Sequence, residues 1–227
     1  MSVKPVIELT ADGSHTLFIP ELNEHYHSVN GAIQESQHVF IEAGLRHTQK
    51  DVVHILEIGF GTGLNAFLTL LDSQYNVKRI HYTSIEAYPL STTLIRQLNY
   101  PNGYSQQQQS LYYQLHEAGW NKRIDITPQF CLEKIQADFT NFDFNQITEF
   151  VDLVYFDAFA PDKQPDMWKQ EIFDKLYLIS NDQGILVTYC AKGVIRRMMQ
   201  QSGYKTERLP GPPGKREMLR AVKGSVI

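Results

Sequence analysis

The stretch VVHILEIGFGTGLN (Val52 to Asn65) decides the fold of this 227-residue chain. It begins as a continuous apolar run, which is typical of a buried strand, and it ends in three glycines separated by single residues, Gly59, Gly61 and Gly63. Glycines at this position let the backbone turn sharply and let a ligand approach amide hydrogens that a Cβ would block. The stretch therefore predicts a strand, a ligand-binding turn and a helix in succession.

The same rhythm continues to the C-terminal part of the chain. Further strands are predicted in RIHYTSIEA, ITPQFCL, VDLVYFDAF and GILVTYC, and helices at Asn65–Leu71, Leu90–Leu98, Trp168–Leu176 and Val194–Gln201. Strands that alternate with helices at this period indicate parallel strands joined by right-handed crossovers. We therefore expect an α/β, Rossmann-like fold: a mostly parallel, twisted sheet with helices on both faces.

The first fifty residues have a different pattern. VIELTADGSHTLFI alternates apolar and polar residues around Asp12-Gly13, which predicts a hairpin. The following residues place Ile33, Val39, Phe40 and Leu45 at spacings that favour an amphipathic helix. We expect residues 1–50 to form an N-terminal extension, a hairpin and a helix, packed on a main domain of residues 51–227.

Composition excludes several classes of protein. No run approaches the roughly 18 apolar residues of a membrane-spanning helix, and the segment MSVKPVIELT lacks the apolar core of a signal peptide, so a cytoplasmic protein without a membrane partner is expected. Cys131 and Cys190 are far apart, which favours reduced, buried thiols. His25 and His27 have no downstream partner at zinc spacing, so we predict no metal.

Charge is distributed unevenly along the chain. The formal net charge is −4, yet the segment from Lys192 onward holds nine Lys and Arg residues against two Glu. A basic patch of this kind is typical either of a solvated face with charges at helix ends or of a phosphate-binding surface, and both interpretations stay open.

The acid before the glycines argues against a dinucleotide. Glu57 precedes Gly59 by two residues, and the glycine spacing gives ExGxGxG instead of GxGxxG. A pyrophosphate would be repelled by a carboxylate at this place, whereas the ammonium of an aminoacyl group would be attracted. Phe60 and Asn65, on the same turn, are candidate contacts of the same ligand.

Two further acids follow later strands. Glu86, with Ala87 beside it, ends the second strand, where a carboxylate can accept hydrogen bonds from both ribose hydroxyls of an adenosine. Asp138 beside Phe139 follows the third strand and could accept from an adenine amino group while the ring packs on the base; the alternative is that Asp138 only caps a turn. Three acids and a glycine turn together predict a site for S-adenosylmethionine.

Three segments carry a resemblance to a known family. LEIGFGTGLN, VYFDAFAPDKQPDMW and GYKTERLPGPPGKREML resemble the methyltransferase domain of the tRNA 5-methylaminomethyl-2-thiouridine biosynthesis proteins, from about Asp12 to Ala221. The resemblance implies a class I methyltransferase fold and N-methylation of the 5-aminomethyl group of wobble (2-thio)uridine in the tRNA anticodon region. It also implies that Tyr26 lies beside the cofactor pocket. We expect a stand-alone methyltransferase, with a separate oxidoreductase acting upstream.

The segment DAFAPDKQPDMW supplies the candidate catalytic residue. Asp157 stands at a strand end, in a motif that resembles the acid-proline loops of amino methyltransferases, and we expect its carboxylate to orient the acceptor amine; the alternative is a cap for the following turn. Phe159 is expected to face the substrate, with Pro161 and Lys163 as further substrate contacts. Trp168 opens an amphipathic helix and is expected to be mainly core.

The proline-rich turn PGPPG precedes the last candidate residues. Lys215, Arg216 and Glu217 follow it, and two cations on a stiff loop suit RNA phosphates, although a charged hairpin tip would look the same.

Other functions share part of these features. An aminopropyltransferase or a small-molecule N-methyltransferase would use a similar fold and cofactor, a nicotinamide oxidoreductase would need a different glycine spacing, and a non-enzymatic RNA-binding module would not need all four acids.

Overall fold

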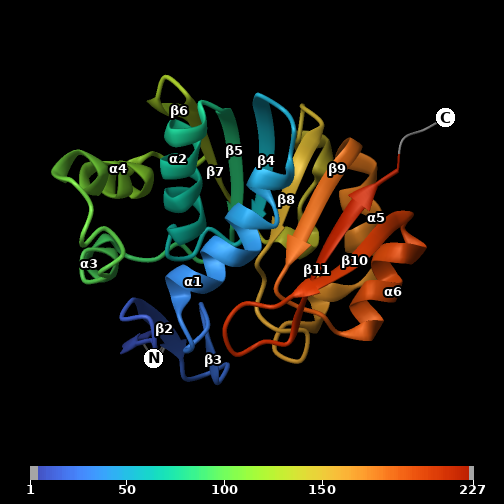
Figure 1. The fold of residues 1–227 in the computed structure, drawn as a ribbon, viewed down its shortest axis with the longest axis horizontal. Helices are drawn as coiled ribbons and strands as arrows, with labels where there is room; N and C mark the ends of the chain where they lie inside the picture. The colour runs from blue at the N-terminus through green and yellow to red at the C-terminus, as the bar shows by residue number, and fades with distance from the viewer. Residues whose placement is uncertain (1–4, 225–227) are drawn as a thin grey trace.

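The computed structural model describes residues 5–224. Its centre is an eight-stranded sheet in the order β10-β11-β9-β8-β4-β5-β7-β6, and a three-stranded sheet β1-β2-β3 lies at the N-terminal end (Figure 1). The strands are β1 Val6–Leu9, β2 His15–Ile19, β3 Glu24–His25, β4 Val52–Ile58, β5 Arg79–Glu86, β6 Lys122–Thr127, β7 Phe130–Gln136, β8 Val151–Phe156, β9 Ser180–Thr188, β10 Tyr204–Pro210 and β11 Glu217–Lys223.

Helices connect most of these strands. The α-helices are α1 Ala32–Ser36, α2 Leu64–Asn76, α3 Thr92–Ile95, α4 Gln106–Glu117, α5 Gln170–Ile179 and α6 Gly193–Gln201. A π-helical turn, Gln37–Glu42, continues α1, and short 3₁₀ turns span Leu45–His47, Phe139–Asn141, Phe144–Gln146 and Pro165–Trp168.

The middle of the main sheet is parallel, as predicted. β7, β5, β4, β8 and β9 pair in parallel, whereas β6 on one side and β11 and β10 on the other pair antiparallel. The chain starts in the centre with β4, moves outward through β5 and β7, and then returns to β8 on the other side of β4. The loops after β4 and β8 therefore diverge, and a crevice opens at their carboxyl ends, where open α/β sheets bind ligands.

Helices cover both faces of the sheet, which confirms the expected layering. Alternate residues of one strand point to opposite faces, so Leu153 of β8 joins a core with α2 and α4, while Val154 joins a second core with α5 and α6. Figure 1 shows α1, α2 and α4 on one side of the sheet and α5 and α6 on the other.

The N-terminal extension contains the predicted hairpin and helix. β1 pairs antiparallel with β2 from Leu9↔His15, and Asp12 closes the turn by accepting the Ser14 backbone N–H at 2.9 Å. The helical segment runs from Ala32 to Glu42 and buries Val39 and Phe40 in the same core as the main sheet. β3, a two-residue strand, lies outside the predicted elements because Glu24 and His25 have no apolar alternation.

Two parts of the main sheet differ from the expectation. ITPQFCL is not one strand but the turn of a hairpin between β6 and β7, because Pro128 has no N–H for a ladder and ends the first strand. β10 and β11 form a second hairpin beyond the last predicted helix, and the PGPPG turn connects them.

No helix within residues 5–224 has the length and apolar character needed to cross a bilayer.

Truncation of Leu153 tests the central packing. Leu153 is fully buried on β8, whereas Leu178 on α5 is 69% exposed. Leu153→Ala is expected to lower the free energy of unfolding by about 2–5 kcal/mol, and Leu178→Ala by less than about 0.5 kcal/mol. Urea titration followed by circular dichroism measures both. Equal losses in the two variants would contradict the assignment of β8 to the core.

Candidate functional site

A cavity of about 360 Å³ lies at the carboxyl ends of β4, β5 and β8. Its walls come from four loops that follow strands and from the N-terminal extension. They include the predicted residues Tyr26, Gly59, Phe60, Gly61, Asn65, Glu86, Ala87, Asp138, Phe139, Asp157, Phe159 and Lys163. This volume is typical of a site for a small molecule.

The glycine turn adopts backbone angles that other residues rarely take. Gly59, Gly61 and Gly63 have φ values of 92°, 47° and 70°, in the left-handed region that favours glycine. A Cβ on Gly61 would lie 2.9 Å from Cδ1 of Tyr26. Gly63 is the N-cap of α2 and does not line the cavity; it allows the turn to enter the helix.

Glu86 links the second strand to the glycine turn. Its carboxylate accepts the backbone N–H of Gly61 at 3.0 Å and that of Tyr88 at 2.8 Å. These bonds fix the carboxylate on the cavity wall and leave oxygen lone pairs for a further donor. Glu86 lines the cavity, and its predicted contact with ribose hydroxyls stays a prediction.

Glu57 lies behind the glycine turn instead of on the cavity wall. Its side chain is fully buried, and one oxygen accepts the Ser84 hydroxyl at 2.7 Å while the other has no hydrogen-bond partner. Burial raises the pKa of Glu57 to about 8; the Ser84 hydrogen bond lowers it, and the charge of Asp157 raises it further. Glu57 is not among the residues that line the cavity, and its predicted ammonium contact stays a prediction.

Asp138 and Phe139 lie together at the end of β7. Asp138 caps a short 3₁₀ turn by accepting the backbone N–H and the hydroxyl of Thr140 at 2.9 and 2.8 Å, which lowers its pKa. Phe139 is buried in the second core and packs edge-on against Phe144. The capping role that the sequence left open is present, and the predicted adenine contact stays a prediction.

Asp157 follows β8 directly and faces the cavity. Its carboxylate accepts a hydrogen bond from the Asn65 amide at 2.8 Å. Burial raises the pKa of Asp157 to about 7, and the charge of Glu35 adds to the rise, while the Asn65 hydrogen bond and the Lys215 ammonium oppose it. A carboxylate that titrates near neutral pH suits a group that must exchange hydrogen bonds with an amine.

The segment after Asp157 divides into cavity wall and core. The ring of Phe159 meets that of Tyr26 edge-on, with centroids 5.2 Å apart, and both line the cavity. Trp168 is buried and donates its indole N–H to the Phe159 carbonyl at 2.8 Å, which confirms that it belongs to the core. Lys163 lines the cavity, whereas Pro161 is half-buried and does not.

The N-terminal extension holds the glycine turn in place. His27 is buried, and its Nε2 forms a 2.8 Å hydrogen bond with the Thr62 hydroxyl, one residue beyond Gly61. Burial lowers the pKa of His27 to about 4, so the ring is neutral at physiological pH. His25 instead pairs with Glu8.

The three residues after the PGPPG turn point in different directions. Lys215 turns inward and pairs with Glu35, Arg216 is exposed, and Glu217 pairs with Arg208 at 3.0 Å. Their predicted contacts with RNA stay predictions, and the placement favours Arg216 over Lys215 as a surface cation.

Glu35 is a site residue that the sequence reasoning missed. It lies on α1 and is nearly buried, and its charge raises the pKa of Asp157. Its spacing, three residues after Ala32 and four before Val39, places an acid on the apolar face of the predicted helix. A buried acid at such a position is the signal that could have revealed it.

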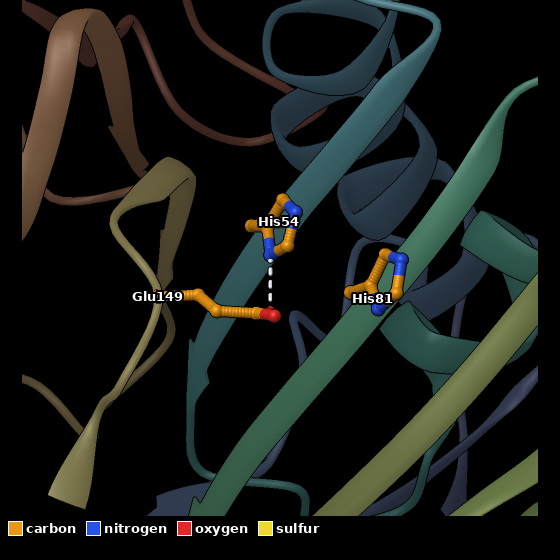
Figure 2. A group of neighbouring side chains, drawn as sticks. All are labelled: His54, His81 and Glu149. Atoms are coloured by element: carbon orange, nitrogen blue, oxygen red, sulfur yellow. Dashed lines mark ion pairs between the residues drawn. The ribbon is translucent and has the colours of Figure 1, made fainter.

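A cluster of His54, His81 and Glu149 lies near the opposite ends of β4 and β5 (Figure 2). Their ligand atoms lie within 4.8 Å of one another, and the His54 Nδ1 to Glu149 Oε2 distance is 2.9 Å. The two imidazoles are stacked with an interplanar angle of 2°, so a single metal ion could not lie in the plane of both rings. Arg123 also contacts Nδ1 of His81. This arrangement suits a charge cluster better than a metal site.

Comparison with known proteins identifies the family. Residues 103–224 match a family described as S-adenosyl-L-methionine-dependent methyltransferases, and the match covers more than half of the chain. The chain belongs to this family. The nicotinamide and aminopropyl alternatives are therefore not supported.

Individual relatives agree with this family. The chain is similar to the tRNA 5-methylaminomethyl-2-thiouridine biosynthesis bifunctional protein MnmC of Methylobacillus flagellatus, with 30% identity over 213 residues, 86% of this chain and 32% of that protein. The corresponding protein of Magnetococcus marinus is 28% identical over 95% of this chain and 33% of its own length. The chain thus spans about a third of the length of the curated relatives it matches.

A solved structure has the same fold. The crystal structure of MNMC2 from Aquifex aeolicus superposes with a TM-score of 0.81 at 25% identity, over 98% of this chain and 71% of that chain. The class I methyltransferase fold predicted from the sequence is therefore confirmed.

The cofactor of this methyltransferase is S-adenosyl-L-methionine, and the residues around the first cavity fit this molecule. The glycine turn keeps side-chain atoms away from one wall, and Glu86 and Asp138 place carboxylates on others. Asn65 lines the cavity, and its Oδ1 is buried without a hydrogen-bond partner. Carboxylates and carbonyl oxygens match the ammonium, hydroxyl and amino donors of the cofactor.

Gly61→Ala tests the glycine turn. The new Cβ would clash with the Tyr26 ring and occupy a backbone conformation with φ +47°, so we expect cofactor affinity to fall at least ~10-fold. Gly103→Ala is the matched control, because it has φ +85° but nothing within 4 Å of the added Cβ. Calorimetric titration with S-adenosyl-L-methionine measures both variants. An equal loss of affinity in the two would show that strain, not the cavity wall, matters.

Proposed function

We propose that this methyltransferase N-methylates the 5-aminomethyl group of wobble (2-thio)uridine in tRNA, giving 5-methylaminomethyl-(2-thio)uridine. The observation that carries the proposal is the position of Asp157, whose side chain lines both the first cavity and a second, adjoining cavity. A methyl donor on one side and an acceptor on the other would meet at this carboxylate. The names of the similar proteins support the choice of acceptor.

The acceptor amine sets the chemical problem. An aliphatic amine with a pKa of roughly 10 is almost entirely protonated at neutral pH and has no lone pair to donate. The site must therefore bind the neutral amine or take up a proton from the ammonium. An ionised carboxylate at the cavity wall can accept that proton, and its second oxygen can accept a remaining N–H. Asp157, with a pKa raised to about 7, can hold the amine in this way and direct its lone pair toward the first cavity.

Positioning accounts for the rest of the mechanism. S-adenosyl-L-methionine, when bound, supplies an electrophilic methyl group on a sulfonium. The residues of this chain would hold the acceptor in line with it, and a displacement of this kind needs no protein nucleophile. Cys131 and Cys190 are buried free thiols outside both cavities.

Aromatic residues would hold the base. Phe159 and Tyr26 line both cavities, and a base that leaves its stack gains about 1–3 kcal/mol from each aromatic contact. Pro161 and Lys163, on the same loop, are proposed as further contacts of the nucleotide. Lys163 lines the first cavity with Asp157, and Pro161 lies two residues after Phe159 on the same loop, which supports the proposal.

The tRNA itself would lie on the basic C-terminal part. Arg216 at the tip of the β10–β11 hairpin is exposed, and Arg197 and Lys205 are exposed on the neighbouring α6 and β10. Cations on one end of an otherwise acidic chain suit the phosphates of the anticodon stem and loop. The proposed setting is the cytoplasm, after an oxidoreductase has removed the carboxymethyl group of the precursor base.

Asp157→Asn tests the proposed chemistry. The amide keeps the shape of the side chain but accepts fewer hydrogen bonds from an amine, so turnover is expected to fall at least ~100-fold while cofactor affinity stays within a few-fold. Mass spectrometry of nucleosides from tRNA that carries 5-aminomethyl uridine measures methyl transfer, and calorimetry measures cofactor binding. Absence of transfer by the wild-type protein would refute the function, and near-normal turnover of the variant would refute the role of Asp157.

Arg216→Glu tests the RNA surface. Loss of one phosphate contact is expected to weaken tRNA binding and to reduce the slope of log affinity against log salt by about 1, with cofactor affinity unchanged. Lys122→Glu is the matched control, since Lys122 is exposed on β6 at the other edge of the sheet and the charge change is the same. Filter binding at several salt concentrations measures both slopes. An equal response of the two variants would argue against a localised surface.

A further inference from the structure

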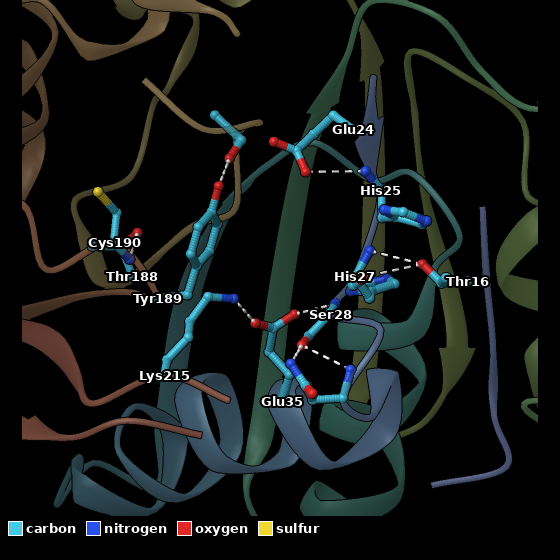
Figure 3. Close-up of polar contacts among 12 residues, drawn as sticks. Thr16, Glu24, His25, His27, Ser28, Glu35, Thr188, Tyr189, Cys190 and Lys215 are labelled. Carbon is cyan, nitrogen blue, oxygen red and sulfur yellow. Dashed lines mark hydrogen bonds and ion pairs between the residues drawn. The ribbon is translucent and has the colours of Figure 1, made fainter. Parts of the chain in front are cut away.

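A second cavity, of about 290 Å³, adjoins the cofactor cavity. The two share Tyr26, His27, Asp157, Ala158 and Phe159, so Asp157 stands at their boundary. The remaining walls come from β3 and the segment that follows it, from α1, from Tyr189 after β9, and from the β10–β11 hairpin (Figure 3).

Glu35 contributes a nearly buried carboxylate to this second cavity. Its side chain is 7% exposed, and one oxygen accepts the backbone N–H of Ser28 at 2.7 Å. The other oxygen pairs with the Lys215 ammonium, as Figure 3 shows. A buried carboxylate is costly without a cation or donors, so Glu35 needs a cation at this place.

Lys215 supplies this cation from a loop. Its ammonium lies 4.5 Å from the centroid of the Tyr189 ring as well as against Glu35. Tyr189 in turn donates its hydroxyl to the Ala158 carbonyl at 2.8 Å, beside Asp157. The Lys215 side chain is 32% exposed, so the ammonium occupies the cavity from its rim and can leave without passing through the core.

The charges around the second cavity favour a cationic ligand. Its walls hold three acids, Glu24, Glu35 and Asp157, against one lysine, Lys215. Of its two histidines, His27 has a neutral ring and His25 pairs with Glu8. The acceptor proposed above arrives as an ammonium. Exchange of one ammonium for another leaves the net charge of the cavity unchanged, so it avoids the cost of an unpaired buried carboxylate.

We propose, on the basis of the proposed function, that Glu35 is a second carboxylate that binds the acceptor amine, and that the Lys215 ammonium occupies the position of this amine until the substrate arrives. The substrate ammonium would then lie between Glu35 and Asp157 and would pass one proton to ionised Asp157 before its lone pair takes the methyl group. The displaced Lys215 would be free to meet an RNA phosphate at the rim. This assigns the N-terminal extension a direct part in substrate binding.

The pair also acts on Asp157 electrostatically. The charge of Glu35 raises the pKa of Asp157 and that of Lys215 lowers it. If turnover needs ionised Asp157, activity falls as pH drops through its pKa. Glu35→Gln then moves this acid limb to lower pH, and Lys215→Met moves it to higher pH. The other titratable or charged groups that share a cavity wall or an electrostatic interaction with Asp157 are unchanged in both variants; they are Glu24, His25, Tyr26, His27, Glu57, Tyr82, Glu86, Tyr88, Asp138, Lys163, Asp166 and Tyr189.

The experiment compares wild type, Glu35→Gln, Lys215→Met and the double variant on tRNA with 5-aminomethyl uridine, from pH 6 to 9. Glu35→Gln is expected to raise KM for tRNA at least ~10-fold and to shift the acid limb downward. Lys215→Met is expected to shift it upward, and the double variant to return it toward wild type. Calorimetric affinity for S-adenosyl-L-methionine reports on folding in each variant.

Controls separate this role from a structural one. Glu117→Gln and Arg96→Met break an exposed ion pair on α3 and α4 and are expected to change neither KM nor the pH profile. Lys215→Arg keeps the cation and is expected to keep the acid limb, which gives a second reading if Lys215→Met does not fold. Shifts of both single variants in the same direction, or unchanged KM in Glu35→Gln, would overturn the inference. Loss of methylation by the wild type would instead overturn the proposed function.

Discussion

The parallel register between β4 and β8 is the constraint on which the site depends. Ile58, the last residue of β4, pairs with Phe156, the last residue of β8, so the glycine turn and Asp157 leave the sheet at the same level. The two loops then diverge, because the chain continues from β4 to β5 on one side of β4 and from β8 to β9 on the other side. A cavity between the loops follows from the order of the strands. The hydrogen bond from Asn65 on α2 to Asp157 links its two sides.

The site gathers buried carboxylates and offsets their cost with few partners. Glu57 has the Ser84 hydroxyl, Asp157 has the Asn65 amide, and Glu35 has Lys215 with the Ser28 backbone. Burial raises the pKa of Glu57 and Asp157, and neutral tyrosines surround them. This part of the molecule gives up stability for a concentration of negative charge, which suits the ammonium groups of the cofactor and of the proposed acceptor.

Much of this could be predicted from the sequence, since the decisive features are local. The glycines, Glu86 and Asp157 each stand at the end of an apolar run, and strand ends in a parallel sheet share one edge. Trp168 lies in the core as expected, but it ends a 3₁₀ turn before α5 instead of opening that helix. The position of Glu57 behind the turn was not foreseen, because spacing does not tell which side of a turn a side chain takes. The pairing of Glu35 with Lys215 could not be foreseen either, since it joins residues 180 positions apart.

That separation also bears on how the protein is made. Ribosomes release a chain from its N-terminal end, so the extension, the glycine turn and Asp157 emerge well before the β10–β11 hairpin. Until the hairpin docks, Glu35 has no ammonium beside it and the second cavity has no outer wall. A nascent chain can therefore bring the glycine turn and Asp157 together before the β10–β11 hairpin adds its wall to the second cavity.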